Sequence, residues 1–220
     1  MNLSLIKSEF QQYIRLSQGR SEVLLEISAQ YDRFSEHWDL RASDIHEMIE
    51  ASLDGTHVFW SGPDYHPYES LLAYAQFGPE MVRSAFTDLL DEKKDLVGRI
   101  DRFQFHLNWL EKKSQDPKHK QKPHYHTVPT IMQYLSMAYP ERYLLYDAQS
   151  FARFLDRVGA KKDPIPSLER FFKVSAIILK IISKELEQLD LDQPLKDMHD
   201  RYPVILISDF LGTVSKERRK

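Results

Sequence analysis

Hydrophobic residues recur at three- and four-residue steps along most of this chain, which places them on one face of an α-helix. Between about residues 21 and 37, for example, Ile27, Tyr31 and Phe34 follow this spacing. Few segments alternate between polar and apolar residues, as a half-buried strand does. The pattern therefore predicts an all-α protein.

Breaks in the periodicity divide the chain into about ten helices. We expect helices at about 3–17, 21–37, 43–53, 68–77, 79–90, 96–110, 127–138, 147–158, 167–189, from 192, and 203–214. Gly78 and Pro79 indicate that one helix ends and the next begins, because glycine suits the position after a helix and proline its first turn. Val204–Ile207 is rich in β-branched residues, so a minor short strand is the alternative there.

The most regular hydrophobic seam steps by four, three, four and three residues and comprises Leu96, Ile100, Phe103, Leu107 and Leu110. Phe105 and Trp109 widen this stripe beyond the narrow seam of a coiled coil. We therefore expect both rings to be buried against neighbouring helices.

A polar break at 113–126 separates two helical stretches. It is rich in lysine and histidine and has hardly any apolar residues, which is typical of an exposed loop or hinge. The sequence thus predicts two packed lobes, 1–112 and 127–220, joined by a basic loop at 113–126.

Composition excludes several classes of chemistry. The chain has no cysteine, which removes disulfides, thiolate metal sites and cysteine nucleophiles. No glycine lies in a phosphate-binding loop or a GxSxG elbow, and His46–Glu47 lacks the second histidine of a zinc-protease helix. Carboxylates gather at Asp88, Asp91, Glu92 and Asp95, where helix capping explains them. We expect no catalytic residue, cofactor or metal, and hence no enzyme.

A membrane location is not indicated. The most apolar run, Val174–Ile182, is short and interrupted by Lys180, and no secretory signal opens the sequence. We therefore expect a cytoplasmic protein without a membrane partner.

The basic break is the leading candidate for a binding site. Its candidate nucleic-acid contacts are Lys112, Lys113, Lys118, Lys120, Lys122, His124 and Tyr125. Lysines attract phosphates and a tyrosine ring can stack on a base. A solvated hinge is the alternative, since runs of charge are often only exposed to solvent. The formal net charge of −3 argues against a globally basic nucleic-acid binder. His119, His124 and His126 lack a fourth ligand for a structural metal site.

A second candidate is an aromatic pocket formed by Trp60, Tyr65 and Tyr68. These rings could hold a base or another ligand. The alternative is a loop that its aromatic side chains attach to the core.

Several segments together resemble a known family. They are Phe86–Glu92, Asp95–Phe103, Pro129–Tyr143 with Tyr146–Asp147, and Tyr202–Phe210. In order and spacing they resemble the amino-terminal helical region ahead of the AAA+ motor in McrB-type (5-methylcytosine-specific) restriction ATPases and related defence proteins. The resemblance covers about 84–212 and is loose before residue 80. No Walker motif precedes the last residue, Lys220, so an excised domain and a stand-alone relative both remain open.

The resemblance implies a role for the chain. In such proteins the region ahead of the motor recognises the target, often DNA, or scaffolds the assembly. It therefore implies a non-catalytic recognition or scaffold module, with an AAA+ motor or another defence-system protein as partner and DNA as a candidate ligand. The alternatives are a helical protein–protein interaction adaptor without nucleic-acid binding and a small-molecule sensor using Trp60 and Tyr65.

Overall fold

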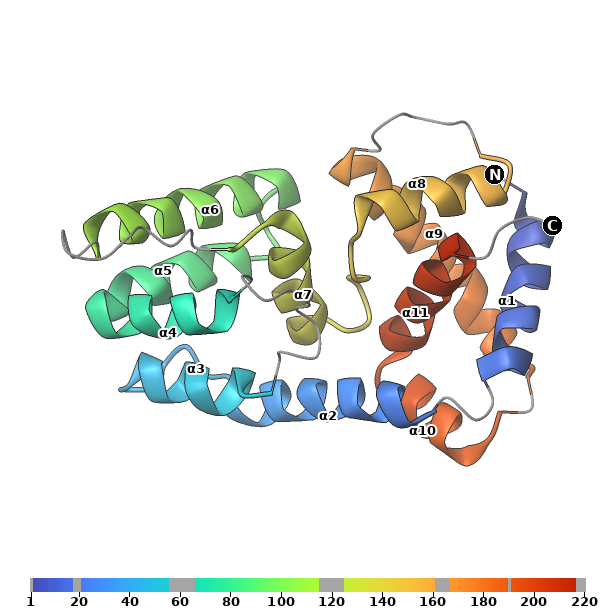
Figure 1. Ribbon diagram of the computed structural model, residues 1–220, viewed down its shortest axis with the longest axis horizontal. Coiled ribbons are helices and arrows are strands. Elements are labelled where there is room, and N and C mark those ends of the chain that lie inside the picture. Colours follow the sequence, from blue (N-terminus) through green and yellow to red (C-terminus); the bar gives the residue numbers. More distant parts are fainter. Residues whose placement is uncertain are drawn as a thin grey trace. The chain divides into compact units, whose positions relative to one another are not determined.

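The computed structural model describes residues 2–17, 21–55, 66–114, 125–160, 167–189 and 191–216. Within these ranges the chain forms eleven α-helices and no strand, which confirms the all-α prediction (Figure 1). The helices are α1 (Leu3–Ser17), α2 (Ser21–His37), α3 (Ile45–Leu53), α4 (Pro67–Phe77), α5 (Pro79–Leu89), α6 (Leu96–Lys113), α7 (Val128–Ala138), α8 (Ala148–Arg157), α9 (Leu168–Leu186), α10 (Gln193–Arg201) and α11 (Pro203–Lys216). None of these described helices is both long enough and apolar enough to cross a membrane.

The helices group into two compact units, one of residues 1–28 and 139–220 and the other of residues 29–138. These boundaries differ from the predicted lobes 1–112 and 127–220. Tyr134 of α7 packs edge-on against Phe86 of α5, so α7 belongs with the helices before the basic break. Phe10 of α1 packs edge-on against Phe210 of α11, so the first helix joins the last one.

Short polar side chains begin several helices. The side chain of Asp44 accepts a hydrogen bond from the backbone N–H of Glu47, so Asp44 rather than Ser43 caps α3. Four more helices begin with the same cap, in which a side chain accepts a hydrogen bond from the backbone N–H three residues later. The capping residues are Asp95 for α6, Asp147 for α8, Ser167 for α9 and Asp192 for α10. Such caps satisfy backbone donors that have no partner inside the helix. These caps explain why the starts of the helices could be predicted from the sequence.

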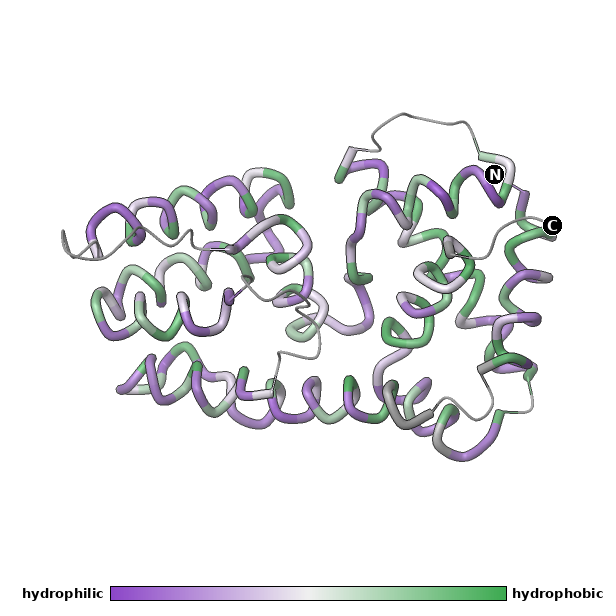
Figure 2. Tube along the Cα trace, in the orientation of Figure 1, coloured by the Kyte–Doolittle hydropathy of each residue, from purple (hydrophilic) through white to green (hydrophobic). Residues whose placement is uncertain are grey.

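The segment Val204–Ile207 is helical, so the strand alternative is wrong. Pro203 opens α11, and all four side chains of the segment are buried. Packing of α11 against α8, α1 and α9 buries this apolar stretch and overrides its local strand preference. Figure 2 shows how hydrophobic positions recur along this and the other helices.

An aromatic cluster forms the core of the unit of residues 29–138. The fully buried Phe86 ring meets three other rings edge-on: Trp38 at 4.7 Å between centroids, Phe103 at 4.9 Å and Tyr134 at 5.2 Å. This geometry places the positive edge of one ring against the negative face of the next. The cluster joins α5, α6 and α7 to Trp38, which directly follows α2.

A buried arginine stabilises the turn between α5 and α6. Arg99 is only 2 % exposed, and its Nη1 donates to the carbonyl of Leu89 at 2.8 Å and to Oε1 of Glu92 at 2.7 Å. The guanidinium thus satisfies the end of α5 and neutralises a carboxylate at the start of the turn.

We expect Arg99→Met to lower the free energy of unfolding by about 3 kcal/mol, because the buried carbonyl and carboxylate lose their charged donor. Denaturant titration followed by circular dichroism measures this change. Arg41→Met is the matched control: Arg41 pairs with Asp39 but its side chain is 92 % exposed, so a change within about 0.5 kcal/mol is expected. Equal effects of the two substitutions would contradict the role of Arg99.

Candidate nucleic-acid interface

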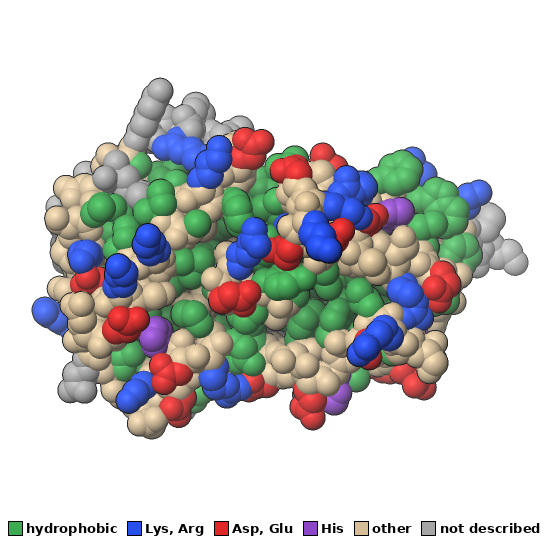
Figure 3. Space-filling view, turned by 180° about the vertical axis from the view of Figure 1, so that it is seen from behind, with side chains coloured by type: hydrophobic (Ala, Val, Ile, Leu, Met, Phe, Trp, Pro, Cys, Tyr) green, Lys and Arg blue, Asp and Glu red, His purple; other side chains and the backbone are tan. Residues whose placement is uncertain are grey.

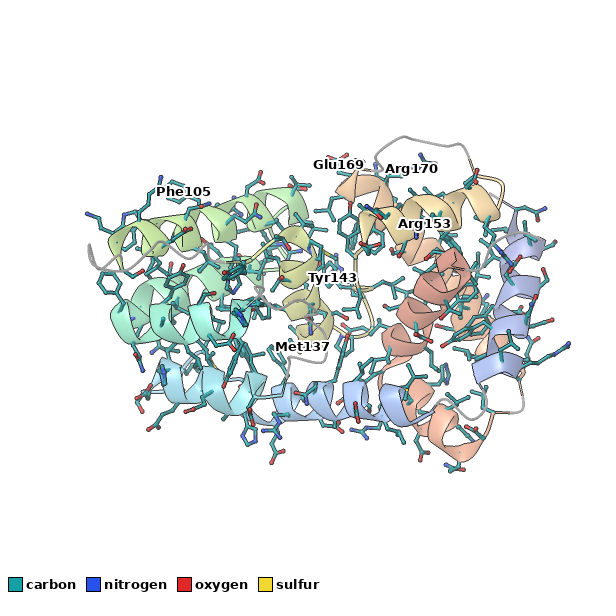
Figure 4. The ribbon with its side chains drawn as sticks, in the orientation of Figure 1. Phe105, Met137, Tyr143, Arg153, Glu169 and Arg170 are labelled. Carbon is teal, nitrogen blue, oxygen red and sulfur yellow. The ribbon has the colours of Figure 1, made fainter. Side chains whose placement is uncertain are left out.

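Helix α6 has one buried and one exposed hydrophobic face. The seam of Leu96, Ile100, Phe103, Leu107 and Leu110 is buried, as expected. Phe105 is 67 % exposed and Trp109 is 40 % exposed, so the prediction that both rings are buried is wrong. At about 100° per residue, Phe105 lies on nearly the opposite side of the helix from Phe103. In Figure 4 the labelled Phe105 lies on the side of α6 away from α5.

Basic side chains share this exposed face. Arg102, Lys112 and Lys113 are all exposed, and with Phe105 and Trp109 they occupy an arc of about 100° around the helix axis. We call these five residues the basic-aromatic stripe. The Nζ atom of Lys113 lies 5.9 Å from the centre of the Trp109 ring, a cation–π arrangement. Over this unit, Figure 3 shows hydrophobic and basic side chains exposed close together at the upper right.

Two of the predicted contacts, Lys112 and Lys113, belong to the last turn of α6. Lys118, Lys120, Lys122 and His124 lie outside the described residues, as does His119. On either side of these residues, the described parts of the chain are bonded to α6. The backbone N–H of Ser114 donates to the carbonyl of Leu110 at 2.8 Å, and Nε2 of Gln104 donates to the carbonyl of His126 at 3.3 Å. The described residues Ser114 and His126 are therefore both bonded to the helix that carries the stripe.

The chain re-enters the described structure at Tyr125 and His126. Tyr125 has a φ of 59°, in the left-handed region, and its carbonyl accepts the backbone N–H of Thr127 at 2.9 Å. His126 is fully buried, with Nε2 3.1 Å from the hydroxyl of Tyr134. His126 is thus part of the aromatic core and is not placed to serve as a ligand at the surface.

Tyr125, at the end of the basic break, contacts a residue that is next in sequence to the predicted aromatic segment. Its ring lies edge-on to the ring of His66, with centroids 6.2 Å apart. His66 directly follows residues 56–65, which contain Trp60 and Tyr65 and lie outside the described residues. The contact therefore joins the basic break to the end of the aromatic segment, which the sequence did not predict.

Tyr68, the third member of the predicted aromatic pocket, lies in acidic surroundings. Burial raises the pKa of its hydroxyl, and the charges of Asp54, Glu50 and Glu69 raise it further. These carboxylates disfavour a phosphate near Tyr68. The surroundings of Tyr68 therefore do not extend the basic-aromatic stripe.

The carboxylates around the α5–α6 turn have structural partners. Lys94 hydrogen bonds to Asp88 and thereby lowers the pKa of that carboxyl, while Asp95 caps α6 and Glu92 pairs with Arg99. Among the described residues, no three histidine or carboxylate side chains come together as a metal site requires. These carboxylates are accounted for by the packing of the turn.

Comparison with known proteins adds no family. The sequence matches no protein-family model, and no curated protein and no solved structure matches it. The resemblance to the region ahead of an McrB-type motor therefore depends on the sequence segments alone.

The two faces of α6 should respond differently to substitution. We expect Phe103→Ala to lower the free energy of unfolding by about 3–5 kcal/mol, because it leaves a cavity in the aromatic core. Phe105→Ala should change it by no more than about 0.5 kcal/mol, because the ring is exposed. Denaturant titration of the two variants compares the same chemical change on opposite faces. A cost for Phe105→Ala as large as that for Phe103→Ala would show that the outer face is covered.

Proposed function

We propose that this chain is a non-catalytic recognition or scaffold module of a restriction-type defence system driven by an AAA+ ATPase, and that it contacts DNA through α6. The observation that supports the DNA contact is the basic-aromatic stripe, where Phe105 and Trp109 are exposed beside Arg102, Lys112 and Lys113. The resemblance to the region ahead of McrB-type motors supports the place in such a system. The lack of cysteine agrees with a cytoplasmic location.

Exposed rings next to cations match the two parts of a nucleic-acid strand. The lysines and the arginine neutralise phosphates, and each phosphate contact releases condensed counterions. The aromatic faces stack on bases at a gain of about 1–3 kcal/mol per base. Phe105 and Trp109 form an exposed apolar patch next to basic side chains, and such patches mark interaction surfaces.

The rings favour unpaired bases over an intact duplex. Phe105 and Trp109 are four residues apart, which puts their Cβ atoms about 5–6 Å apart on one helix face. Two neighbouring bases of a single strand can stack on rings at this spacing, whereas the faces of duplex bases are covered by each other. The ligand is therefore a single strand or an exposed, unpaired stretch of DNA.

The lysine-rich residues that follow α6 in the sequence belong to the same proposal. Ser114 and His126, which are described on either side of Lys118, Lys120 and Lys122, are each bonded to α6. Added positive charge from these lysines would strengthen the attraction of a polyanion.

Titration with labelled DNA, as a single strand and as the duplex with its complement, tests the proposal at several salt concentrations. We expect the single strand to bind more tightly, with affinity falling as salt rises. Trp109→Ala and Phe105→Ala should each weaken binding about 5- to 150-fold, because each removes a stacking face. Lys112→Gln with Lys113→Gln should make the slope of log affinity against log salt shallower by about 1.4.

Helix α9 offers the matched control. Lys173, Ile177 and Lys180 are exposed on it in a similar order of charge, hydrophobic residue and charge, but without an aromatic ring. Ile177→Ala and the pair Lys173→Gln with Lys180→Gln should leave DNA affinity and its salt slope unchanged. Equal losses from the α6 and α9 variants would show that binding depends only on total charge. No binding of either DNA form would refute the DNA contact and leave the protein–protein adaptor, with the stripe as its interface.

A further inference from the structure

A cavity of about 460 Å³ lies within the unit of residues 1–28 and 139–220. Its lining comes from the chain before α8, from α8, α9 and α11, and from Ile27 of α2. Pockets of about 300–1,000 Å³ are the size that small-molecule ligands occupy. Neither the basic-aromatic stripe nor the proposed DNA contact involves this cavity.

Aromatic rings form much of the wall. Phe171 lies perpendicular to Phe151, with centroids 5.0 Å apart and an angle of 89°, and Tyr146 meets Phe171 edge-on at 4.7 Å. Phe151 and Phe171 are almost fully buried, so their positions are fixed by packing. Burial, and then the charge of Asp147, raises the pKa of Tyr146, so its hydroxyl stays neutral. Tyr146 is only partly buried, so it is the ring of this wall that a flat group can contact.

The polar residues of the cavity are acidic or neutral. Asp147 and Asp209 line it, and none of its described lining residues is lysine, arginine or histidine. Oδ1 of Asp147 accepts the backbone N–H of Ser150 at 2.6 Å, and Oδ2 of Asp209 accepts the hydroxyl of Tyr13 at 2.8 Å. A carboxylate has two oxygens with about four acceptor positions, so each one is held in place and can accept further hydrogen bonds. Both features favour a cation.

Gly212 keeps part of this volume open. It lies in the interior of α11 and lines the cavity, and a Cβ atom added to it would meet nothing within 4 Å. Glycine is less favourable than alanine inside a helix, and here neither backbone conformation nor close packing requires it. The glycine therefore lowers helix stability and leaves space that a side chain would fill.

From this geometry we propose that the cavity binds a small organic cation, an amine or guanidinium carried on a flat apolar body. The body packs against Tyr146, which Phe171 supports from behind, and the cationic group hydrogen bonds to the carboxylates of Asp147 and Asp209. The same chemistry is offered by a free small molecule and by an arginine side chain of a peptide.

Benzamidine and benzamide form the first test, because they share shape and size but differ in charge. We expect benzamidine to raise the melting temperature of the full chain in a saturable way and benzamide to leave it unchanged, since a ligand of the folded state stabilises it. N-acetyl-arginine amide, compared with its neutral citrulline analogue, tests whether the cavity binds an arginine side chain of a peptide. Binding of either cation supports the proposal and identifies the source. Equal shifts from charged and neutral probes, or no shift from any probe, would overturn it.

Two variants locate the binding within the cavity. Gly212→Leu fills the open space and should abolish benzamidine binding measured by calorimetry. Asp209→Asn keeps an acceptor for Tyr13 but removes the charge, and should weaken binding at least about tenfold. Asp101→Asn, on the exposed side of α6, is the control and should leave affinity unchanged. Circular dichroism verifies the fold of each variant, and unaltered affinity in both cavity variants would place any bound cation elsewhere.

Gly212→Ala tests, without any ligand, whether the glycine lowers the stability of α11. We expect it to raise the melting temperature by about 2–4 °C without ligand, because alanine favours the helix and its methyl group enters open space. Thermal unfolding followed by circular dichroism measures the shift. A lower melting temperature would mean that packing requires the glycine, which would contradict the argument for a maintained cavity.

Discussion

The edge-on packing of Phe86 against Trp38, Phe103 and Tyr134 sets the orientation of α6 and thereby determines what the unit of residues 29–138 presents to solvent. Because Phe103 is directed into this cluster, the rotation of the helix is fixed and Phe105 must face outward. The exposed rings are therefore a consequence of the core. Their exposure costs little in folding, since the same helix still buries a complete hydrophobic seam.

Helix positions and the all-α class were predictable because periodicity, short polar caps and the Gly78–Pro79 break are local signals. The prediction that Phe105 and Trp109 are buried was wrong, although a helical wheel places Phe105 and Phe103 on nearly opposite sides of the helix. Hydrophobicity alone does not distinguish a ring that packs in the core from one reserved for a ligand. The association of α1 with α11 and the contact of His66 with Tyr125 were not predictable, because such long-range pairings leave no local pattern.

The two proposed sites differ in charge. The stripe on α6 combines basic side chains with exposed rings, which suits the proposed polyanion. The cavity beside α11 is lined by two carboxylates, which suit the proposed cation. These opposite charges would keep the two proposed ligands from competing for the same site.

The attachment of Ser114 and His126 to α6 has a consequence for how the protein can change. Ser114 and His126 are each bonded to the same helix, and His126 is also anchored in the aromatic core. Where two chain ends are held in this way, doubling the length of a flexible connection costs only about 0.6 kcal/mol. Inserting residues between Ser114 and His126 should therefore change the stability of this unit little.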